Sequence, residues 1–109
     1  MDKKLLYNTT YDYELADGSV VPLTLTFIAL LQLKKKNKSL YERYNKAMLN
    51  MAKEKYDELD NLVLLYAAYV CANLDKEDIL SEEEFIYLCG SDRAKMNDAL
   101  GELTQPKKA

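Results

Sequence analysis

The sequence predicts an α+β fold that is mainly helical, with an N-terminal β-hairpin followed by a bundle of four to five helices. Three observations support this prediction. Residues 5–15 alternate between two faces, as in a half-buried strand. Beyond residue 25, apolar residues recur with helical spacing. The stretch Leu62–Ala72, LVLLYAAYVCA, is apolar at every position.

The apolar stretch Leu62–Ala72 predicts a central helix. It is too short to cross a bilayer, which needs about 20 apolar residues. It is also long and alanine-rich for a strand. Because a helix that is apolar on all sides must be surrounded by protein, we expect the other elements to pack around it.

The hairpin is expected within residues 5–25, with its turn at Asp17–Gly18. A two-residue loop there would pair Tyr13 with Pro22 and place apolar side chains of the return strand beside polar ones. A three-residue loop over 16–18, with Gly18 left-handed, keeps one face apolar and is the expected geometry. The missing N–H of Pro22 then points away from the partner strand or lies on an edge. The expected pairs are Thr9 with Leu25, Tyr11 with Leu23, and Tyr13 with Val21.

Capping signals place the first helices of the bundle. Thr26 is expected to cap a helix that ends near 34–37. Ser39 and Glu42 form a capping-box pattern that predicts the start of a second helix.

The central helix and the last two helices also carry signals at their ends. The central helix is expected to begin near Asp57 or Asp60, whose charges suit a helix N-terminus, and to end around Asn73. The pair Ser81 and Glu84 predicts a short helix that Gly90 closes. Ser91 or Asp92 is expected to cap the last helix, which has an apolar stripe of Met96, Ala99, Leu100 and Leu103.

At 109 residues, the chain predicts one domain over residues 1–104, with helices from 26 to 104 and a disordered tail at 105–109. The hydrophobic fraction of 49% and the charged fraction of 30% are typical of a soluble globular protein. No signal peptide follows Met1, which predicts a cytoplasmic protein. Cys71 and Cys89 lie in apolar helical contexts and are expected to be buried, reduced thiols.

The residue types argue against an enzyme, and we expect no catalytic residue, cofactor or metal ion. The chain has no histidine, the commonest general base and a common metal ligand. It has neither a glycine-rich phosphate loop nor a nucleophile elbow. Asp75–Asp78 resembles the start of a calcium loop, but Ile79 and Leu80 stand where ligands and a glycine are needed. These carboxylates are interpreted as loop and helix-start charges.

The lysine run over residues 34–38 has two interpretations. Lysines favour a helix C-terminus, where they interact with the dipole and the free carbonyls. The same run could bind nucleic acid, but a net charge of −3 argues against a general affinity for phosphate. We therefore expect no nucleic-acid partner and no membrane.

Tyrosine is unusually frequent, with nine residues against two phenylalanines and no tryptophan. Tyrosine combines an apolar ring with a polar tip and is enriched at interfaces. Tyr41, Tyr44, Tyr66 and Tyr69 are expected to pack at the edge of the core. Three tyrosines of the hairpin are candidate partner-binding residues, because a lone hairpin leaves its outer edges without ladder partners. They are Tyr7, Tyr11 and Tyr13.

Three segments carry a resemblance to a known family: LTFIALLQLKKKNKSLYERYNKAM, LYAAYVCAN and SEEEFIYLCGSDRAKMNDALGEL. In texture and order, the chain from Val20 onward resembles the short tail assembly chaperones of long-tailed phages and prophages of Gram-positive bacteria. The resemblance implies a small, helix-rich protein of the host cytoplasm. We also expect the chain to form homo-oligomers. Its implied partners are the tape measure protein, which it would coat, and the tail-tube protein, whose subunits it would recruit.

The leading hypothesis is therefore a non-enzymatic phage tail assembly chaperone. It would temporarily cover hydrophobic stripes on the tape measure protein. One alternative is a small phage regulator that binds nucleic acid through the 34–38 lysine run. Another is an enzyme or metal protein with an unrecognised site, which the absence of histidine disfavours. Salt-dependent DNA binding would favour the regulator, and co-purification with a long coiled-coil protein would favour the chaperone.

Overall fold

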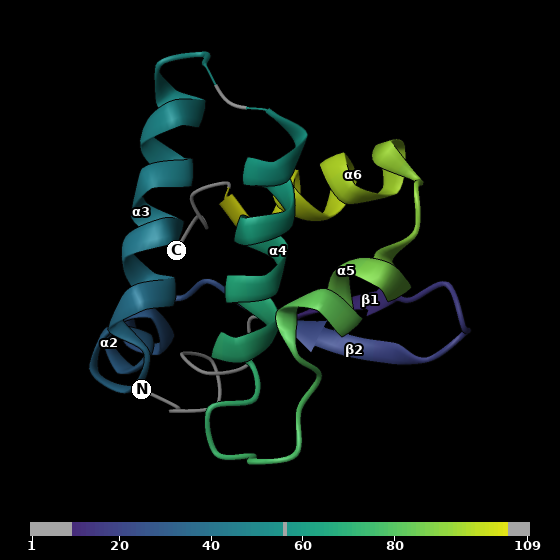
Figure 1. The fold of residues 1–109 in the computed structure, drawn as a ribbon, viewed down its shortest axis with the longest axis horizontal. Helices are drawn as coiled ribbons and strands as arrows, with labels where there is room; N and C mark the ends of the chain where they lie inside the picture. Colours follow the sequence, from purple (N-terminus) through teal and green to yellow (C-terminus); the bar gives the residue numbers. More distant parts are fainter. Residues whose placement is uncertain (1–9, 56, 105–109) are drawn as a thin grey trace, which may run out of the picture.

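The computed structural model describes residues 10–55 and 57–104 and has the expected mainly helical α+β fold (Figure 1). Within these residues, a two-stranded antiparallel hairpin precedes five helices. The elements in chain order are β1 (Tyr11–Glu14), β2 (Val20–Leu23), α2 (Phe27–Lys36), α3 (Lys38–Ala52), α4 (Glu58–Cys71), α5 (Glu82–Cys89) and α6 (Arg93–Thr104).

Helix α4 is the centre of the structure, as the sequence predicts. It packs against β2 and against all four other helices of the described chain (Figure 1). Leu64, Leu65 and the pair Ala67–Ala68 are fully buried. The two alanines leave space for the hairpin to approach the α4 backbone, so that the Thr24 N–H donates a hydrogen bond of 3.1 Å to the Ala68 carbonyl.

The hairpin has the predicted three-residue loop. Tyr11 pairs with Leu23 and Tyr13 with Val21, which confirms the expected register. The Leu15 N–H donates to the Ser19 carbonyl at 2.8 Å, and Gly18 has a φ of 89°, the left-handed conformation that glycine adopts without a Cβ clash. The predicted pair of Thr9 with Leu25 involves a residue outside the described range.

Proline in β2 causes no loss of a ladder hydrogen bond. Pro22 lies opposite Asp12, one position from the hydrogen-bonded pairs, so its nitrogen faces away from β1. Strand β2 ends at Leu23, two residues earlier than predicted, because the next N–H turns to α4.

The helix caps agree with the predicted ones at most positions. The Thr26 side chain accepts a hydrogen bond from the Ala29 N–H and begins α2. The prediction that Ser39 begins the second helix is wrong, because the Asn37 side chain accepts from the Leu40 N–H at 3.2 Å and places Ser39 inside the first turn. Asn37 also donates its own N–H to the Leu33 carbonyl, so one residue ends α2 and begins α3.

The remaining helix ends follow the expected chemistry. Asp57 and Asp60 form a reciprocal capping box at α4, and Ser81 and Glu84 form one at α5. Between the two predicted candidates for α6, the structure selects Asp92, whose carboxylate accepts the Lys95 N–H. Helix α4 ends at Cys71, slightly before the expected Asn73.

Both cysteines are buried and unbonded, as predicted. Burial raises the pKa of the Cys71 thiol to about 12 and that of Cys89 to about 11, because a thiolate loses its hydration inside the core. The neutral thiols are therefore the stable form in the folded chain.

This burial predicts a loss of stability at high pH. A thiol with a raised folded pKa stabilises the fold fully below its unfolded value, near 9, and this contribution is lost as pH rises toward the folded values. The free energy of unfolding should stay constant up to about pH 9 and then fall. Urea denaturation between pH 7 and 11 measures the free energy of unfolding at each pH. Cys71→Ala should make this free energy fall less steeply with pH above pH 9. A Cys71→Ala variant with the wild-type slope would contradict the assignment to Cys71.

A charge in the middle of α4 should unfold the chain. Leu65→Asp and Ala68→Asp each bury an unpaired carboxylate, and we expect each to lower the free energy of unfolding by about 4 kcal/mol or more. Leu59→Asp is the matched control on the same helix, because Leu59 is 66% exposed. Thermal unfolding followed by circular dichroism separates the variants. Wild-type melting temperatures for both core variants would show that α4 is not the core helix.

Candidate functional site

The hairpin tyrosines do not form one exposed surface. Tyr7 lies outside the described residues, and Tyr11 is half-buried at the start of β1. Tyr13 is 1% exposed and belongs to the core. The Lys95 ammonium of α6 lies 5.0 Å from the centre of the Tyr13 ring and donates to the Glu14 carbonyl. In this conformation the ring of Tyr13 cannot reach a partner.

The Tyr13 hydroxyl is buried and has no hydrogen-bond partner among the described residues. Desolvation, together with the nearby Cys89, Asp92 and Tyr11, raises the pKa of Tyr13 to about 12. An unpaired buried hydroxyl costs free energy, whereas the ring itself fills space between β1 and α6. The Tyr13 hydroxyl therefore makes no hydrogen bond that would stabilise the described part of the fold.

Removal of this hydroxyl tests the placement of Tyr13. We expect Tyr13→Phe to leave the free energy of unfolding unchanged or to raise it by up to about 1 kcal/mol. Tyr69→Phe is the matched control, because the Tyr69 hydroxyl accepts the Leu80 N–H at 2.9 Å, and its loss should cost about 1 kcal/mol. Urea denaturation of the two variants measures the difference. A Tyr13→Phe loss as large as that of Tyr69→Phe would mean that the Tyr13 hydroxyl has a partner.

The hairpin is anchored to the helices at both ends. The Ala16 N–H in the turn donates to the Leu88 carbonyl of α5 at 2.7 Å, and the Thr24 N–H donates to α4. The ammonium of Lys95 binds β1 from α6. Within the described chain, these contacts therefore hold the hairpin in one position against the helices.

Exposed apolar side chains gather on α2 instead. Phe27 is 91% exposed, and Ile28 and Leu31 also face outward. Because each residue turns a helix by about 100°, these three side chains and those of Lys34 and Lys35 fall within an arc of about 120°. We call these five residues the α2 stripe. The buried residues of α2 occupy the opposite side and are Ala29, Leu30 and Leu33.

Helix α2 therefore does not bury all of its apolar side chains against the other described helices. The sequence does contain a signal for the exposed residues, since FIALL at 27–31 is apolar on more than one helical face. Among the described elements, α2 makes its main contacts with α3 and α4, and these contacts do not bury all of its apolar side chains. The α2 stripe is therefore the apolar surface that sequence reasoning missed.

The lysine run begins on this stripe. The Lys34 ammonium lies 5.6 Å from the centre of the Tyr41 ring, and that of Lys36 donates to the Leu74 carbonyl beyond α4 at 2.8 Å. Lys36 thus joins the end of α2 to the segment after the central helix, a contact with another element and not with the carbonyls of α2 itself. Lys35 and Lys38 are exposed, and α2 contains no acidic residue.

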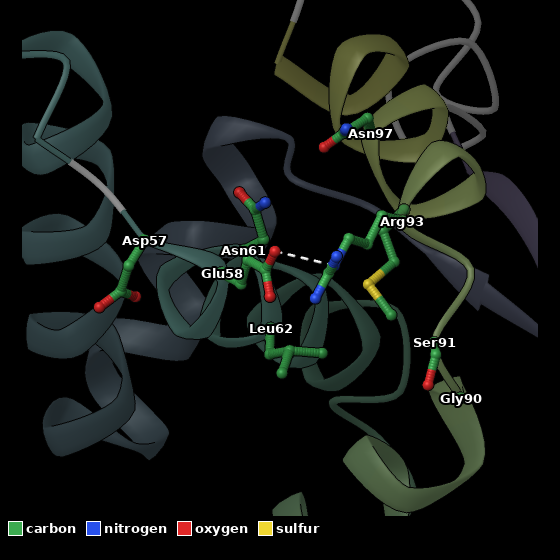
Figure 2. A pocket seen from close by; sticks show the side chains of 9 residues that line it. Asp57, Glu58, Asn61, Leu62, Gly90, Ser91, Arg93 and Asn97 are labelled. Atoms are coloured by element: carbon green, nitrogen blue, oxygen red, sulfur yellow. Dashed lines mark ion pairs between the residues drawn. The ribbon is translucent and has the colours of Figure 1, made fainter.

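A cleft of about 400 Å³ with a mixed polar and apolar lining lies between the start of α4 and the start of α6 (Figure 2). Glu58 and Arg93 form an ion pair of 2.8 Å in it, and both side chains are well exposed, so the pair contributes little stability. The described residues contain no cluster of three or more metal-ligating side chains. The cleft residues include no cysteine or histidine that could act as a nucleophile or a base. The residues that line the cleft are Asp57, Glu58, Asn61, Leu62, Gly90, Ser91, Arg93, Met96 and Asn97.

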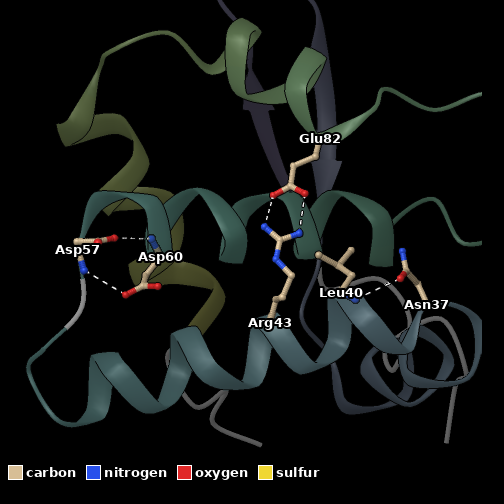
Figure 3. Close-up of polar contacts among 6 residues, drawn as sticks. All are labelled: Asn37, Leu40, Arg43, Asp57, Asp60 and Glu82. Carbon is tan, nitrogen blue, oxygen red and sulfur yellow. Dashed lines mark hydrogen bonds and ion pairs between the residues drawn. The ribbon is translucent and has the colours of Figure 1, made fainter.

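Helix α5 presents an acidic surface. Arg43 of α3 donates two hydrogen bonds, of 2.7 and 2.6 Å, to the Glu82 carboxylate (Figure 3). This bond lowers the pKa of Glu82 and raises that of Arg43. Glu83 and Tyr87 point outward one turn apart, and Tyr87 is 83% exposed.

Two tyrosines of α4 hold the segment before α5. The Tyr66 hydroxyl donates to the Leu80 carbonyl at 3.0 Å, and the Leu80 N–H donates to Tyr69. Phe85 of α5 stacks on Tyr69 with a centroid distance of 4.9 Å. Tyr66 packs at the edge of the core, as predicted, whereas Tyr69 is buried within the core. Together their contacts fix the orientation of the acidic surface.

Comparisons of this chain with protein-family models, with curated proteins and with solved structures find no match. Over the described residues, no helix combines the length and apolar character needed to span a membrane. Function must therefore be inferred from the residues of the chain itself.

Proposed function

We propose that this chain is a non-enzymatic phage tail assembly chaperone of the host cytoplasm. It binds the tape measure protein and helps to recruit tail-tube subunits. The observation that supports this proposal is the α2 stripe, with Phe27 almost fully exposed beside Leu31. Contiguous exposed apolar side chains are typical of protein-binding surfaces. The resemblance of the sequence to short tail assembly chaperones supplies the identity of the partners.

The chemistry of the α2 stripe suits an amphipathic helical partner. Phe27 and Leu31 are one turn apart, the spacing at which an apolar helix face presents its own side chains. Lys34 and Lys35 continue the stripe and would interact with carboxylates that flank the apolar face of the partner. Binding of this kind covers an apolar stripe reversibly, which is what a chaperone of a long helical protein requires.

The alternative of a nucleic-acid-binding regulator has weaker support. Lys36 is engaged by the Leu74 carbonyl and is not free to bind phosphate. Lys35 lies among the exposed apolar side chains of α2, and the chain has a net charge of −3. A net negative charge argues against a general affinity for phosphate.

The test of the proposal is binding to a purified tape measure protein. Phe27→Ser with Leu31→Ser should weaken binding by about 100-fold, corresponding to the loss of about 3 kcal/mol from two apolar contacts. Both side chains are exposed, so the fold should be preserved. Leu49→Ser with Leu59→Ser is the matched control, because it removes two exposed apolar side chains from other helices. Isothermal titration calorimetry measures the affinities.

Two outcomes would contradict the proposal. One is the absence of binding between the wild-type chain and the tape measure protein at micromolar concentrations. The other is duplex or single-strand binding that weakens steeply with salt and disappears when Lys34, Lys35, Lys36 and Lys38 are replaced by Gln. Loss of tape measure binding in the control pair alone would place the site at the α3–α4 end and not on α2.

A further inference from the structure

We propose that the α2 stripe of one molecule docks on the acidic face of α5 in a second copy, so that the chain self-associates head to tail. The acidic α5 face consists of Glu83, Glu84 and Tyr87. Both surfaces are present on the same folded chain and are complementary in charge and in apolar character.

The three residues of the acidic α5 face lie on one exposed side of the helix. Rotation by about 100° per residue places Glu83, Glu84 and Tyr87 within one arc of about 100°. Phe85 and Cys89 are buried on the other side. Glu82 is held by Arg43, and Glu84 accepts the Ser81 N–H in the capping box, so Glu83 is the carboxylate best placed for a partner.

The two faces match in spacing when the helices run antiparallel. Leu31 and Lys35 are four residues apart on α2, and Tyr87 and Glu83 are four residues apart on α5. Each pair spans about 6 Å along its helix. Antiparallel alignment places Leu31 against Tyr87 and Lys35 against Glu83. It also brings the lysine-bearing C-terminal end of α2 to the N-terminal end of α5, so that the helix dipoles attract each other.

Charge decides between a head-to-tail contact and a symmetric one. Helix α2 carries three lysines and no acidic residue, and α5 carries three glutamates and no basic residue. A symmetric pairing of two α2 helices would bring lysines together, whereas α2 against α5 places Lys35 beside Glu83, the carboxylate that makes no hydrogen bond or ion pair within the described chain. Both helices pack on α4, and Figure 1 shows them on different sides of it. The contact therefore joins different molecules and leads to open chains or rings.

Two short helices bury less than the roughly 1,200 Å² of a stable interface, so the association should be weak and concentration-dependent. One consequence rests on the proposed function. Because the α2 stripe is also the proposed site for the tape measure protein, a second copy covers it until that partner competes for it. In the absence of the tape measure protein, the self-associated chaperone would therefore expose less apolar surface than an isolated monomer does.

Complementary charge reversal tests the contact directly. In sedimentation velocity at concentrations up to about 500 μM, chosen for a weak interface, the wild-type chain should show a rising sedimentation coefficient. Lys34→Glu with Lys35→Glu should remain monomeric alone, and so should Glu83→Lys. An equimolar mixture of the two variants should associate again, because each contributes the surface that the other has lost. Lys46→Glu with Lys55→Glu, the same charge change elsewhere, should behave as wild type.

A second variant tests the apolar half of the contact without a change of charge. Tyr87→Ser keeps the capping box and should reduce self-association at least fivefold. The proposal is overturned if the wild-type chain remains monomeric at these concentrations, if the reversed variants associate like wild type, or if their mixture stays monomeric. None of these measurements includes the tape measure protein, so failure of the proposed function would leave the self-association result intact.

Discussion

Burial of α4 is the constraint on which the rest of the structure depends. An apolar helix of this kind is stable only when protein covers it on every side, and the other helices and β2 supply that cover. Ala67 and Ala68 have a specific part in this arrangement, because their small side chains allow the backbone near Thr24 to approach and hydrogen-bond to the helix.

The contacts that α4 makes with neighbouring elements determine where the exposed surfaces of the molecule lie. Tyr66 and Tyr69 hold the backbone of Leu80, and Phe85 packs on the same rings, so α5 has one orientation relative to the core. The Arg43–Glu82 pair adds a second attachment from α3 (Figure 3). Glutamates that cap α5 and face outward thereby form a surface with a fixed position relative to the core.

Charge and apolar character are segregated on the outside of the bundle. The α2 stripe is basic and apolar, and the acidic α5 face is acidic and carries an exposed tyrosine. A protein that acts by reversible contact benefits from such an arrangement, because complementary charges orient weak apolar contacts without a large buried area. The cleft between α4 and α6 offers less, since its Glu58–Arg93 pair is exposed and satisfied within the chain.

The sequence by itself determined the fold class, the central helix, the hairpin register and most helix caps, because these depend on local patterns of polarity and on short-range hydrogen bonds. It misplaced the start of α3, where Asn37 and Ser39 offer competing caps and only the observed chain path selects Asn37. It also did not separate Tyr13, which tertiary contacts bury, from residues available to a partner, since alternation shows which face is apolar but not what covers it. The sequence shows that α2 is apolar on more than one face, but tertiary structure decided that Phe27 and Leu31 stay exposed, because α3 and α4 pack on the opposite side of the helix.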